Sequence, residues 1–150
     1  MEKMEISKEG IALIKRFEGC SLSSYLCQAN VPTIGFGSTK GVKMGMEISQ
    51  ERAEALLLED VADFEDAINE IVQVPLQQNQ FDALCSWVFN LGPNNLKSST
   101  LLAVLNQGKY KDVPEQIIRW NKAGGKILEG LKKRRASESL LFQGKEWENV

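Results

Sequence analysis

The stretch "KRFEGCSLSSYLCQANVPTIGFGST", residues 15–39, decides the fold because the pattern changes there from helical to β-type. Just upstream and at its start, Ile11, Ile14 and Phe17 recur at the spacing of one helical face. The glycine that follows Glu18 is a typical helix stop, so Glu18 is expected in the last helical turn. The negative end of the helix dipole disfavours another negative charge there, which makes Glu18 a candidate proton donor.

The segment that follows is rich in β-type runs. Short runs at 24–27, 33–36 and 42–44 are separated by glycine, proline and asparagine, which predicts a small sheet with tight turns. Ser49 is then a candidate cap for a helix over 51–72, whose apolar positions form one long stripe. A helix of that length could join two lobes.

The remainder of the chain is predicted to be helical. Residues 78–91 carry apolar side chains at the i, i+3, i+4, i+7 spacing, and a Gly-Pro pair ends this helix. Shorter helical patterns follow at 99–108, 113–121 and 130–142. Trp87 and Trp120 lie on apolar helical faces and are expected in the core. The sequence therefore indicates an α+β, mostly helical protein with a small β-containing lobe near its N-terminus.

The composition fits one domain that folds unaided. A chain of 150 residues with 43% hydrophobic content can bury a core of its own. Eighteen basic and 20 acidic residues give a net charge of −2, which offers no global reason to bind nucleic acid or a membrane surface. The longest apolar run near the N-terminus is "IALI", so neither an export signal nor membrane insertion is expected.

The absence of histidine limits the chemistry that the chain can perform. The commonest general base and metal ligand is missing, so proton transfer falls to Asp, Glu, Cys, Lys or Tyr. Cys20, Cys27 and Cys85 are odd in number and form no CxxC, which indicates reduced thiols rather than a zinc site or a disulfide framework. No metal and no cofactor are expected.

An ordered series of motifs resembles the phage lysozymes, the muralytic endolysins of T-even and lambdoid phages. The resemblance runs from about residue 7 to 142 and rests on "FEG" at 17–19, "YLC" at 25–27, "TIGFG" at 33–37, "FDALCSWVFNLG" at 81–92, "STLLAVLNQGKY" at 99–110, "RWNKAGG" at 119–125 and "GLKKRRASE" at 130–138. It implies a single lysozyme domain of residues 1–150. The small lobe would cover about 15–60 and the helical lobe about 1–14 and 61–150, with a long helix joining them and a cleft between.

The resemblance implies hydrolysis of the β-1,4 bond between N-acetylmuramic acid and N-acetylglucosamine in peptidoglycan. The family pattern is a Glu, an Asp nine residues later and a Thr six after that; Glu18 and Thr33 match, and Cys27 replaces the Asp. Ser38 follows "TIGFG", where many members carry a histidine. We expect Glu18 to be the general acid, Cys27 the base or the nucleophile, and Thr33 a hydroxyl that positions the water or the Cys27 side chain.

Substrate contacts are also expected outside the catalytic set. Gln28 and Asn30 flank Cys27 and could supply amide donors and acceptors to sugars, and Asn90 matches a family asparagine that could order a loop or contact sugar. Arg134 and Arg135, in the run "KKRR", could form a cationic rim that contacts peptidoglycan carboxylates; a solvated helix face explains this run equally well.

Two alternatives to an active hydrolase remain at this point. The missing Asp is consistent with a catalytically weak lysozyme fold that only binds peptidoglycan, and a lytic transglycosylase would need the second group less. The family implies a monomer held in the host bacterial cytoplasm and released to the periplasm and cell wall through a holin.

Overall fold

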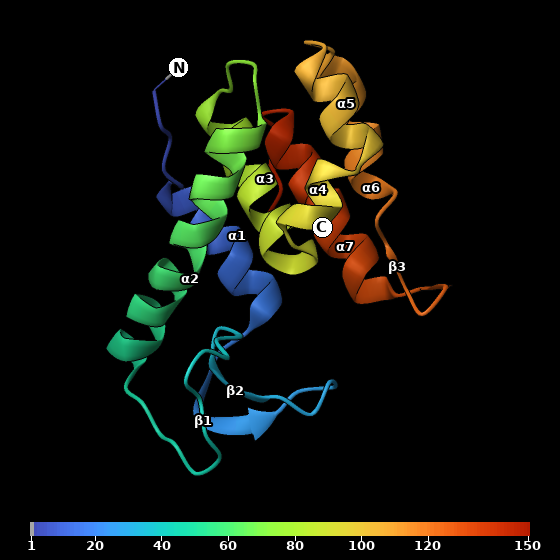
Figure 1. Ribbon diagram of the computed structural model, residues 1–150. Coiled ribbons are helices and arrows are strands. Elements are labelled where there is room, and N and C mark those ends of the chain that lie inside the picture. Colours follow the sequence, from blue (N-terminus) through green and yellow to red (C-terminus); the bar gives the residue numbers. More distant parts are fainter. Residues whose placement is uncertain (1) are drawn as a thin grey trace. The chain divides into compact units, whose positions relative to one another are not determined.

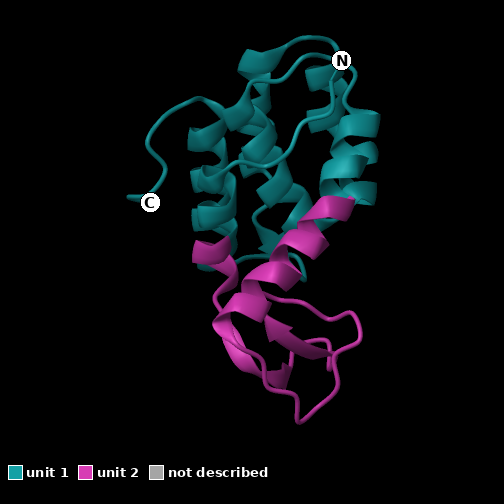
Figure 2. Ribbon diagram, turned by 90° about the vertical axis from the view of Figure 1, so that its left-hand side faces the viewer, with its two compact units in different colours: residues 1–14, 64–150 teal, residues 15–63 magenta. Residues whose placement is uncertain are grey.

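The structure is a computed structural model that describes residues 2–150. It contains two compact units (Figure 2): unit 1 comprises Met1–Ile14 and Phe64–Val150, and unit 2 comprises Lys15–Asp63. The boundaries between the units fall inside two helices, α1 and α2 (Figure 1). The α+β, mostly helical class is confirmed, since helices account for most of the chain and the strands are few and short.

Unit 2 contains a β-hairpin that follows the last turn of α1 (Lys8–Glu18) and precedes α2 (Gln50–Ile71). Its strands, β1 (Ser21–Leu26) and β2 (Pro32–Gly35), pair in the antiparallel sense. The register shifts ahead of the Tyr25–Thr33 pair, as in a β-bulge. The hairpin therefore carries position 27 just beyond the end of one strand and position 33 inside the other.

The third β-type run, expected at 42–44, is not a strand, and this prediction was wrong. Gly41 and Gly45 have φ values of 71° and 89°, so the chain turns on both sides of the run instead of extending. The chain meets β1 slightly later, through a single bridge between Ser23 and Glu47. The expected sheet is thus a two-stranded hairpin with one isolated bridge beside it.

The long helix α2 forms as the sequence predicts. The hydroxyl oxygen of Ser49 accepts a hydrogen bond from the backbone N–H of Arg52 at 3.0 Å, which caps the first turn. Ala53, Leu57 and Val61 are almost fully buried, so the apolar stripe does face the protein interior.

Unit 1 is a set of helices with one small hairpin. Its elements after α2 are α3 (Gln78–Leu91), α4 (Pro93–Lys97), α5 (Thr100–Asn106), the 3₁₀ turn η1 (Tyr110–Asp112), α6 (Val113–Ile118), β3 (Lys122–Ala123), β4 (Lys126–Ile127) and α7 (Glu129–Phe142). The sequence analysis missed α4 and the hairpin. A proline at the first position starts α4 where it also stops α3, and two glycines with positive φ form the two-residue loop between β3 and β4.

The core of unit 1 is built around α3, which packs against α7. Every residue of α3 from Phe81 to Val88 is buried, and the indole ring of Trp87 meets that of Trp120 edge to face at 5.1 Å between ring centroids. The prediction that Trp87 packs in the core is confirmed, since its exposure is 0%. Burial raises the pKa of the Cys85 thiol well above its usual value, which makes this cysteine a packing residue.

The N-terminal segment is held by side chains of two helices rather than by a sheet. Asn69 binds both the N–H and the carbonyl of Met4, and Glu65 accepts a hydrogen bond from the N–H of Ile6 at 2.6 Å. Asp82 accepts bonds from the N–H and the hydroxyl of Ser7 at the start of α1. These bonds satisfy backbone groups at the start of the chain that no sheet or helix pairs.

The C-terminal segment is also fixed to the start of the molecule. The indole N–H of Trp147 donates to a carboxylate oxygen of Glu9 at 2.8 Å, and Trp147 is only 4% exposed. None of the helices within residues 2–150 is both long enough and apolar enough to cross a membrane.

Gly10 of α1 offers a test of how tightly α1 packs on α3. A methyl group at Gly10 would lie 2.6 Å from Ile6 and 2.9 Å from Asp82, closer than real contacts allow. We therefore expect Gly10→Ala to destabilise the protein by about 1–3 kcal/mol, as overpacking of a tight site does.

The matched control is Gly130→Ala in α7, where no neighbouring atom lies within 4 Å of the added carbon. Alanine favours helices over glycine, so this variant should be neutral or slightly stabilising, by at most about 1 kcal/mol. Urea unfolding of both variants measures the difference, and equal stability of the two would contradict the close packing of Gly10.

Candidate active site

Glu18 is the last residue of α1, as the sequence predicts, and its side chain is half-buried. The helix ends there because the backbone turns at Gly19, which has a φ of 68°. The Glu18 carboxylate lies against the backbone of Gly37: a methyl group placed on Gly37 would be 3.1 Å from Oε1. Only glycine leaves this space free, which explains one glycine of the "TIGFG" motif.

The turn that faces Glu18 is short and closed. Ile34 and Ser38 exchange both backbone hydrogen bonds, at 2.9 and 2.8 Å, and leave a loop of only three residues between them. Gly35 and Gly37 adopt φ values of 65° and 88°, a region that side-chain-bearing residues rarely occupy. The glycines of this motif therefore serve a tight turn beside a carboxylate.

Cys27 and Thr33 lie together where the hairpin of unit 2 closes. The backbone N–H of Cys27 donates to the carbonyl of Val31 at 3.1 Å, and the Thr33 hydroxyl donates to the same carbonyl at 2.8 Å. Asn30 closes the intervening turn with a φ of 59°. The Cys27 side chain is half-buried, and that of Thr33 is 3% exposed.

The environment of Cys27 favours the thiolate. Backbone hydrogen bonds from Val31 and Ala29 lower the pKa of the thiol below its usual value of 9.0, and the Thr33 hydroxyl adds to the effect. Partial burial acts in the opposite direction but is outweighed. A lowered thiol pKa raises the fraction of sulfur that can accept a proton at neutral pH.

Unit 2 thus holds two small clusters that β2 connects. Thr33, beside Cys27, is in the strand, and Gly37, beside Glu18, follows it. Gln28 and Asn30 are exposed in the turn next to Cys27, where they are free to meet a ligand from solvent.

The three substrate-contact candidates in unit 1, which are Asn90, Arg134 and Arg135, belong to one cluster that is joined by hydrogen bonds and ion pairs. The Asn90 side chain is exposed and accepts a hydrogen bond from Nη2 of Arg135 at 2.9 Å. Arg134 and Arg135 are only 4% and 0% exposed. The expected cationic rim is therefore wrong for these two arginines, because their guanidinium groups are inside the protein and bind a buried carboxylate.

That carboxylate belongs to Glu138, which is fully buried on α7. Its Oε1 is 2.7 Å from Nε of Arg135, its Oε2 is 3.3 Å from Nε of Arg134, and the Ser86 hydroxyl of α3 donates to Oε2 at 2.5 Å. Burial raises the pKa of Glu138, while Arg135 and then Arg134 act in the opposite direction. A buried acid of this kind needs both charges and hydrogen bonds, which the cluster supplies.

Sequence reasoning missed Glu138 and Ser86, although a signal for the ion pairs was present. Glu138 lies three and four residues after the two arginines, which is the spacing of neighbours on one helical face. No comparable local signal points to Ser86, because it meets the cluster from another helix.

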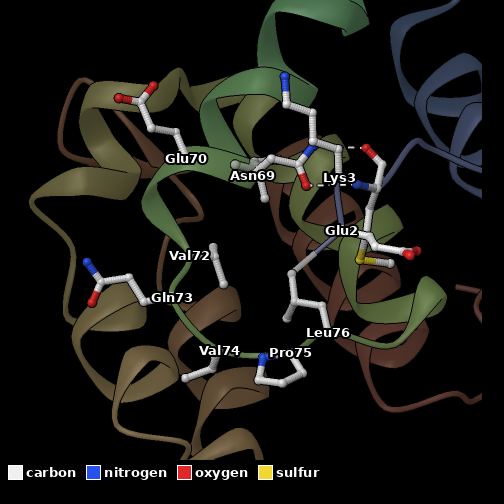
Figure 3. A pocket seen from close by; sticks show the side chains of 11 residues that line it. Glu2, Lys3, Asn69, Glu70, Val72, Gln73, Val74, Pro75 and Leu76 are labelled. Atoms are coloured by element: carbon white, nitrogen blue, oxygen red, sulfur yellow. Dashed lines mark hydrogen bonds between the residues drawn. The ribbon is translucent and has the colours of Figure 1, made fainter.

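A cavity of about 650 Å³ lies in unit 1 between the N-terminal segment and the chain that follows α2 (Figure 3). Val72, Val74 and Leu76 line it, together with the exposed residues Lys3 and Glu70. Asn69, the amide on this wall, already binds Met4 and Glu65. None of the predicted catalytic residues lines this cavity, so it is not a candidate active site.

Metal ligation finds no support in the side-chain arrangement. Within residues 2–150 no group of three or more His, Cys, Asp or Glu side chains is placed to hold a metal ion. The three cysteines are free thiols.

Comparisons with known proteins identify the family of this chain. The family model described as phage lysozyme matches residues 15–138. An endolysin of Acyrthosiphon pisum secondary endosymbiont phage 1 is 46% identical over 144 residues, which cover 93% of this chain and 99% of the relative.

Two solved structures extend the similarity to the fold. The crystal structure of a P22 lysozyme mutant has a TM-score of 0.86 at 42% identity and covers 93% of this chain and 99% of that one. The muramidase domain of SpmX from Asticaccaulis excentricus has a TM-score of 0.87 at 36% identity, covering 92% and 97%.

The contact between Gly37 and Glu18 yields a test of the site geometry. We expect Gly37→Ala to lower the bacteriolytic rate by roughly tenfold or more, because the added methyl group pushes on the Glu18 carboxylate. The positive φ also strains the variant, at about 1–3 kcal/mol.

Gly41→Ala separates the two effects. Gly41 has a φ of 71°, so alanine is strained there too, but no atom lies within 4 Å of the added carbon. Turbidity loss of chloroform-treated cells and thermal unfolding are measured for both variants. Equal lytic rates would show that the space beside Glu18 does not matter.

Proposed function

Because the chain belongs to the phage lysozyme family, whose members are glycoside hydrolases that degrade peptidoglycan, we propose that it cleaves the β-1,4 bond between N-acetylmuramic acid and N-acetylglucosamine. Glu18 is the general acid, Cys27 the general base, and Thr33 the hydroxyl that holds Cys27. The observation that carries this assignment is the place of Cys27 at the closed end of the hairpin beside Thr33, where backbone hydrogen bonds from Val31 and Ala29 lower the pKa of its thiol.

The role of Glu18 requires a carboxyl group that can hand over a proton. In glycoside hydrolysis a carboxylic acid protonates the leaving oxygen while a second group activates water on the other face of the sugar. Glu18 is the last residue of α1, and its half-buried carboxyl group lies against the backbone of Gly37, next to the turn that follows β2. This fixed position of the carboxyl group supports its assignment as the acid.

We assign Cys27 as the general base because its thiolate can accept a proton from water. As a base, the sulfur takes a proton from water, the hydroxide formed attacks the anomeric carbon, and the proton of Glu18 goes to the departing sugar oxygen. The reaction leaves a hemiacetal with inverted configuration, a neutral thiol and a carboxylate, which exchange protons with solvent to restore the enzyme.

Direct attack by sulfur is the less favourable route. It would give a thioglycoside whose breakdown expels a thiolate with a conjugate acid pKa of about 8.5, a poorer leaving group than a carboxylate with one of about 4. The hydrogen bonds that stabilise the Cys27 thiolate also make it less nucleophilic. We therefore assign Cys27 as a base.

The exposed amides next to Cys27 suit the acetamido groups and hydroxyls of the glycan. Gln28 and Asn30 each offer a donor and an acceptor in the same turn. We further propose that the enzyme remains in the host cytoplasm until a holin opens the inner membrane and gives it access to the wall.

Glu18→Gln tests the acid. The amide has nearly the same shape but no acidic proton, so lysis should fall by roughly 10²–10⁴-fold. The circular dichroism spectrum and melting temperature should stay close to those of the parent. Retained lysis by a folded Glu18→Gln variant would refute the proposed function.

Product analysis of the parent enzyme distinguishes the reaction types. Mass spectrometry of released muropeptides should show reducing N-acetylmuramic acid ends. A 1,6-anhydro end would instead identify a transglycosylase, and no release at all would identify a binding protein.

Cys27→Asp tests the base through its pH dependence. In the proposed mechanism, Glu18 and Cys27 together hold one proton in the active state, and it is on Glu18. Activity therefore falls at high pH, once these two side chains have lost that last proton. In the parent that proton leaves the thiol, whose pKa is lowered below 9.0. In Cys27→Asp it leaves a carboxyl group, so the alkaline limb moves to lower pH by several units.

Two controls complete the test of Cys27. The variant Cys27→Asp should be at least as active as the parent at its own optimum, because two carboxyls share one proton more evenly. Cys27→Ala should lower the rate by roughly 10²-fold. If Cys27→Ala lyses cells like the parent, the sulfur takes no part in catalysis.

A further inference from the structure

We propose that Ser38 and Asp60 are positioning residues for the Glu18 carboxyl, a role that rests on the proposed function of Glu18. They act through the three-residue turn whose Gly37 faces the carboxylate. Neither residue touches the reacting bond in this assignment. Their contribution is to fix the surface against which the acid lies.

The first step in the argument is the rigidity of the turn itself. Ile34 and Ser38 exchange two backbone hydrogen bonds, so residues 35–37 move as one piece with Ser38. Gly37, the residue that limits the space beside Glu18 Oε1, is the direct neighbour of Ser38. A displacement of Ser38 therefore displaces the wall of the acid site.

The second step is how this turn is attached to the rest of unit 2. Gly35 packs against Ala53 of α2, where an added carbon would lie 3.5 Å from the Ala53 side chain. The ring of Phe36 lies under Lys15 of α1, with Nζ 5.5 Å from the ring centroid, and Lys15 forms an ion pair with Glu54. These contacts restrain one side of the turn but are tolerant of small shifts.

The directional restraint is the hydrogen bond between Ser38 and Asp60. The Ser38 hydroxyl donates to Oδ2 of Asp60 at 2.6 Å, and Ser38 is 2% exposed. A hydrogen bond to a charged acceptor is short and directional, and a buried hydroxyl without a partner costs free energy. This bond therefore fixes the distance from the turn to the middle of α2, on the Gly37 side.

The consequence for catalysis follows from how little displacement a catalytic acid tolerates. Catalytic groups must be held within about 0.5 Å of their productive geometry, and a shift of about 1 Å can cost 10²-fold in rate. Loss of the Ser38–Asp60 bond should therefore lower kcat while leaving glycan binding, and hence KM, nearly unchanged.

The test compares Ser38→Ala with a matched serine in the same unit. Ser49→Ala also removes one hydroxyl bond at α2, but that bond caps the helix, with the Ser49 hydroxyl accepting from Arg52, and does not join α2 to the turn. With purified soluble peptidoglycan as substrate and reducing-end release as the readout, Ser38→Ala should lose roughly tenfold or more in kcat. Ser49→Ala should keep the parent kcat despite a lower melting temperature.

Rescue by a conservative variant separates positioning from mere stability. Asp60→Asn keeps a side-chain oxygen that accepts the Ser38 hydroxyl, so it should retain most of the parent kcat, whereas Asp60→Ala should match Ser38→Ala. If Ser38→Ala does not fold, the comparison of Asp60→Ala with Asp60→Asn carries the same test. Unchanged kcat in Ser38→Ala or in Asp60→Ala overturns the inference, and so does an equal loss in Ser49→Ala.

Glu18→Gln, measured in parallel, distinguishes the two levels of the proposal. If Glu18→Gln is active, the proposed function itself has failed. If Glu18→Gln is inactive and Ser38→Ala keeps its kcat, only the positioning role has failed. If Glu18 is the acid and Ser38 positions it, adding Ser38→Ala to Glu18→Gln should lower the residual rate no further, because the turn then has no acid to position. A further tenfold loss in that double variant would contradict a role through Glu18.

Discussion

The close approach of the Glu18 carboxylate to the backbone of Gly37 is the constraint on which the candidate site depends. It requires a helix that ends at Glu18, a turn that presents backbone without a side chain, and a strand that leads into that turn. Each requirement restricts the sequence: the chain reverses after the helix at Gly19, and the turn needs positive φ values at Gly35 and Gly37. The same strand, β2, carries Thr33 beside Cys27, so one short element serves both halves of the site.

In the proposed mechanism, a cysteine at position 27 in place of an aspartate changes the proton affinity of the base more than its position. A thiol gives up its proton well above the pH at which carboxyl groups do, so the arrangement that the proposal requires, with the acid protonated and the base ionised, is the less populated one. Hydrogen bonds from Val31, Ala29 and Thr33 reduce this disadvantage by lowering the thiol pKa. The hairpin turn around Cys27 thus offsets part of the difference in pKa between a thiol and a carboxyl group.

Unit 1 buries three charged side chains, two arginines and a glutamate, on one helix. Removing such charges from water is expensive unless they are paired and hydrogen-bonded. Arg134 and Glu138 both bind Ser86 of α3, and Arg135 pairs with Glu138, so the polar cluster also links the two helices of the core. A run of four basic residues therefore divides by helical face: Lys132 and Lys133 are exposed, whereas the two arginines are inside.

The amino-acid sequence alone determined much of the local structure. Apolar spacing predicted α2 and α3 to within about a residue, and the glycine after Glu18 predicted where α1 ends, because these signals are local. The order of the motifs indicated the family, and it singled out Glu18, Cys27 and Thr33 together. Composition also excluded histidine chemistry, since the chain contains no histidine.

Only the tertiary structure decided which side chains meet across elements and which are inside. It placed Gly37 against Glu18, joined Ser38 to Asp60, and buried Arg134 and Arg135 around Glu138. It also replaced the expected third strand by a turn and a single bridge at Glu47. The physical reason is the same in each case: a hydrogen bond or a burial between residues far apart in the chain depends on packing, and local spacing carries no record of it.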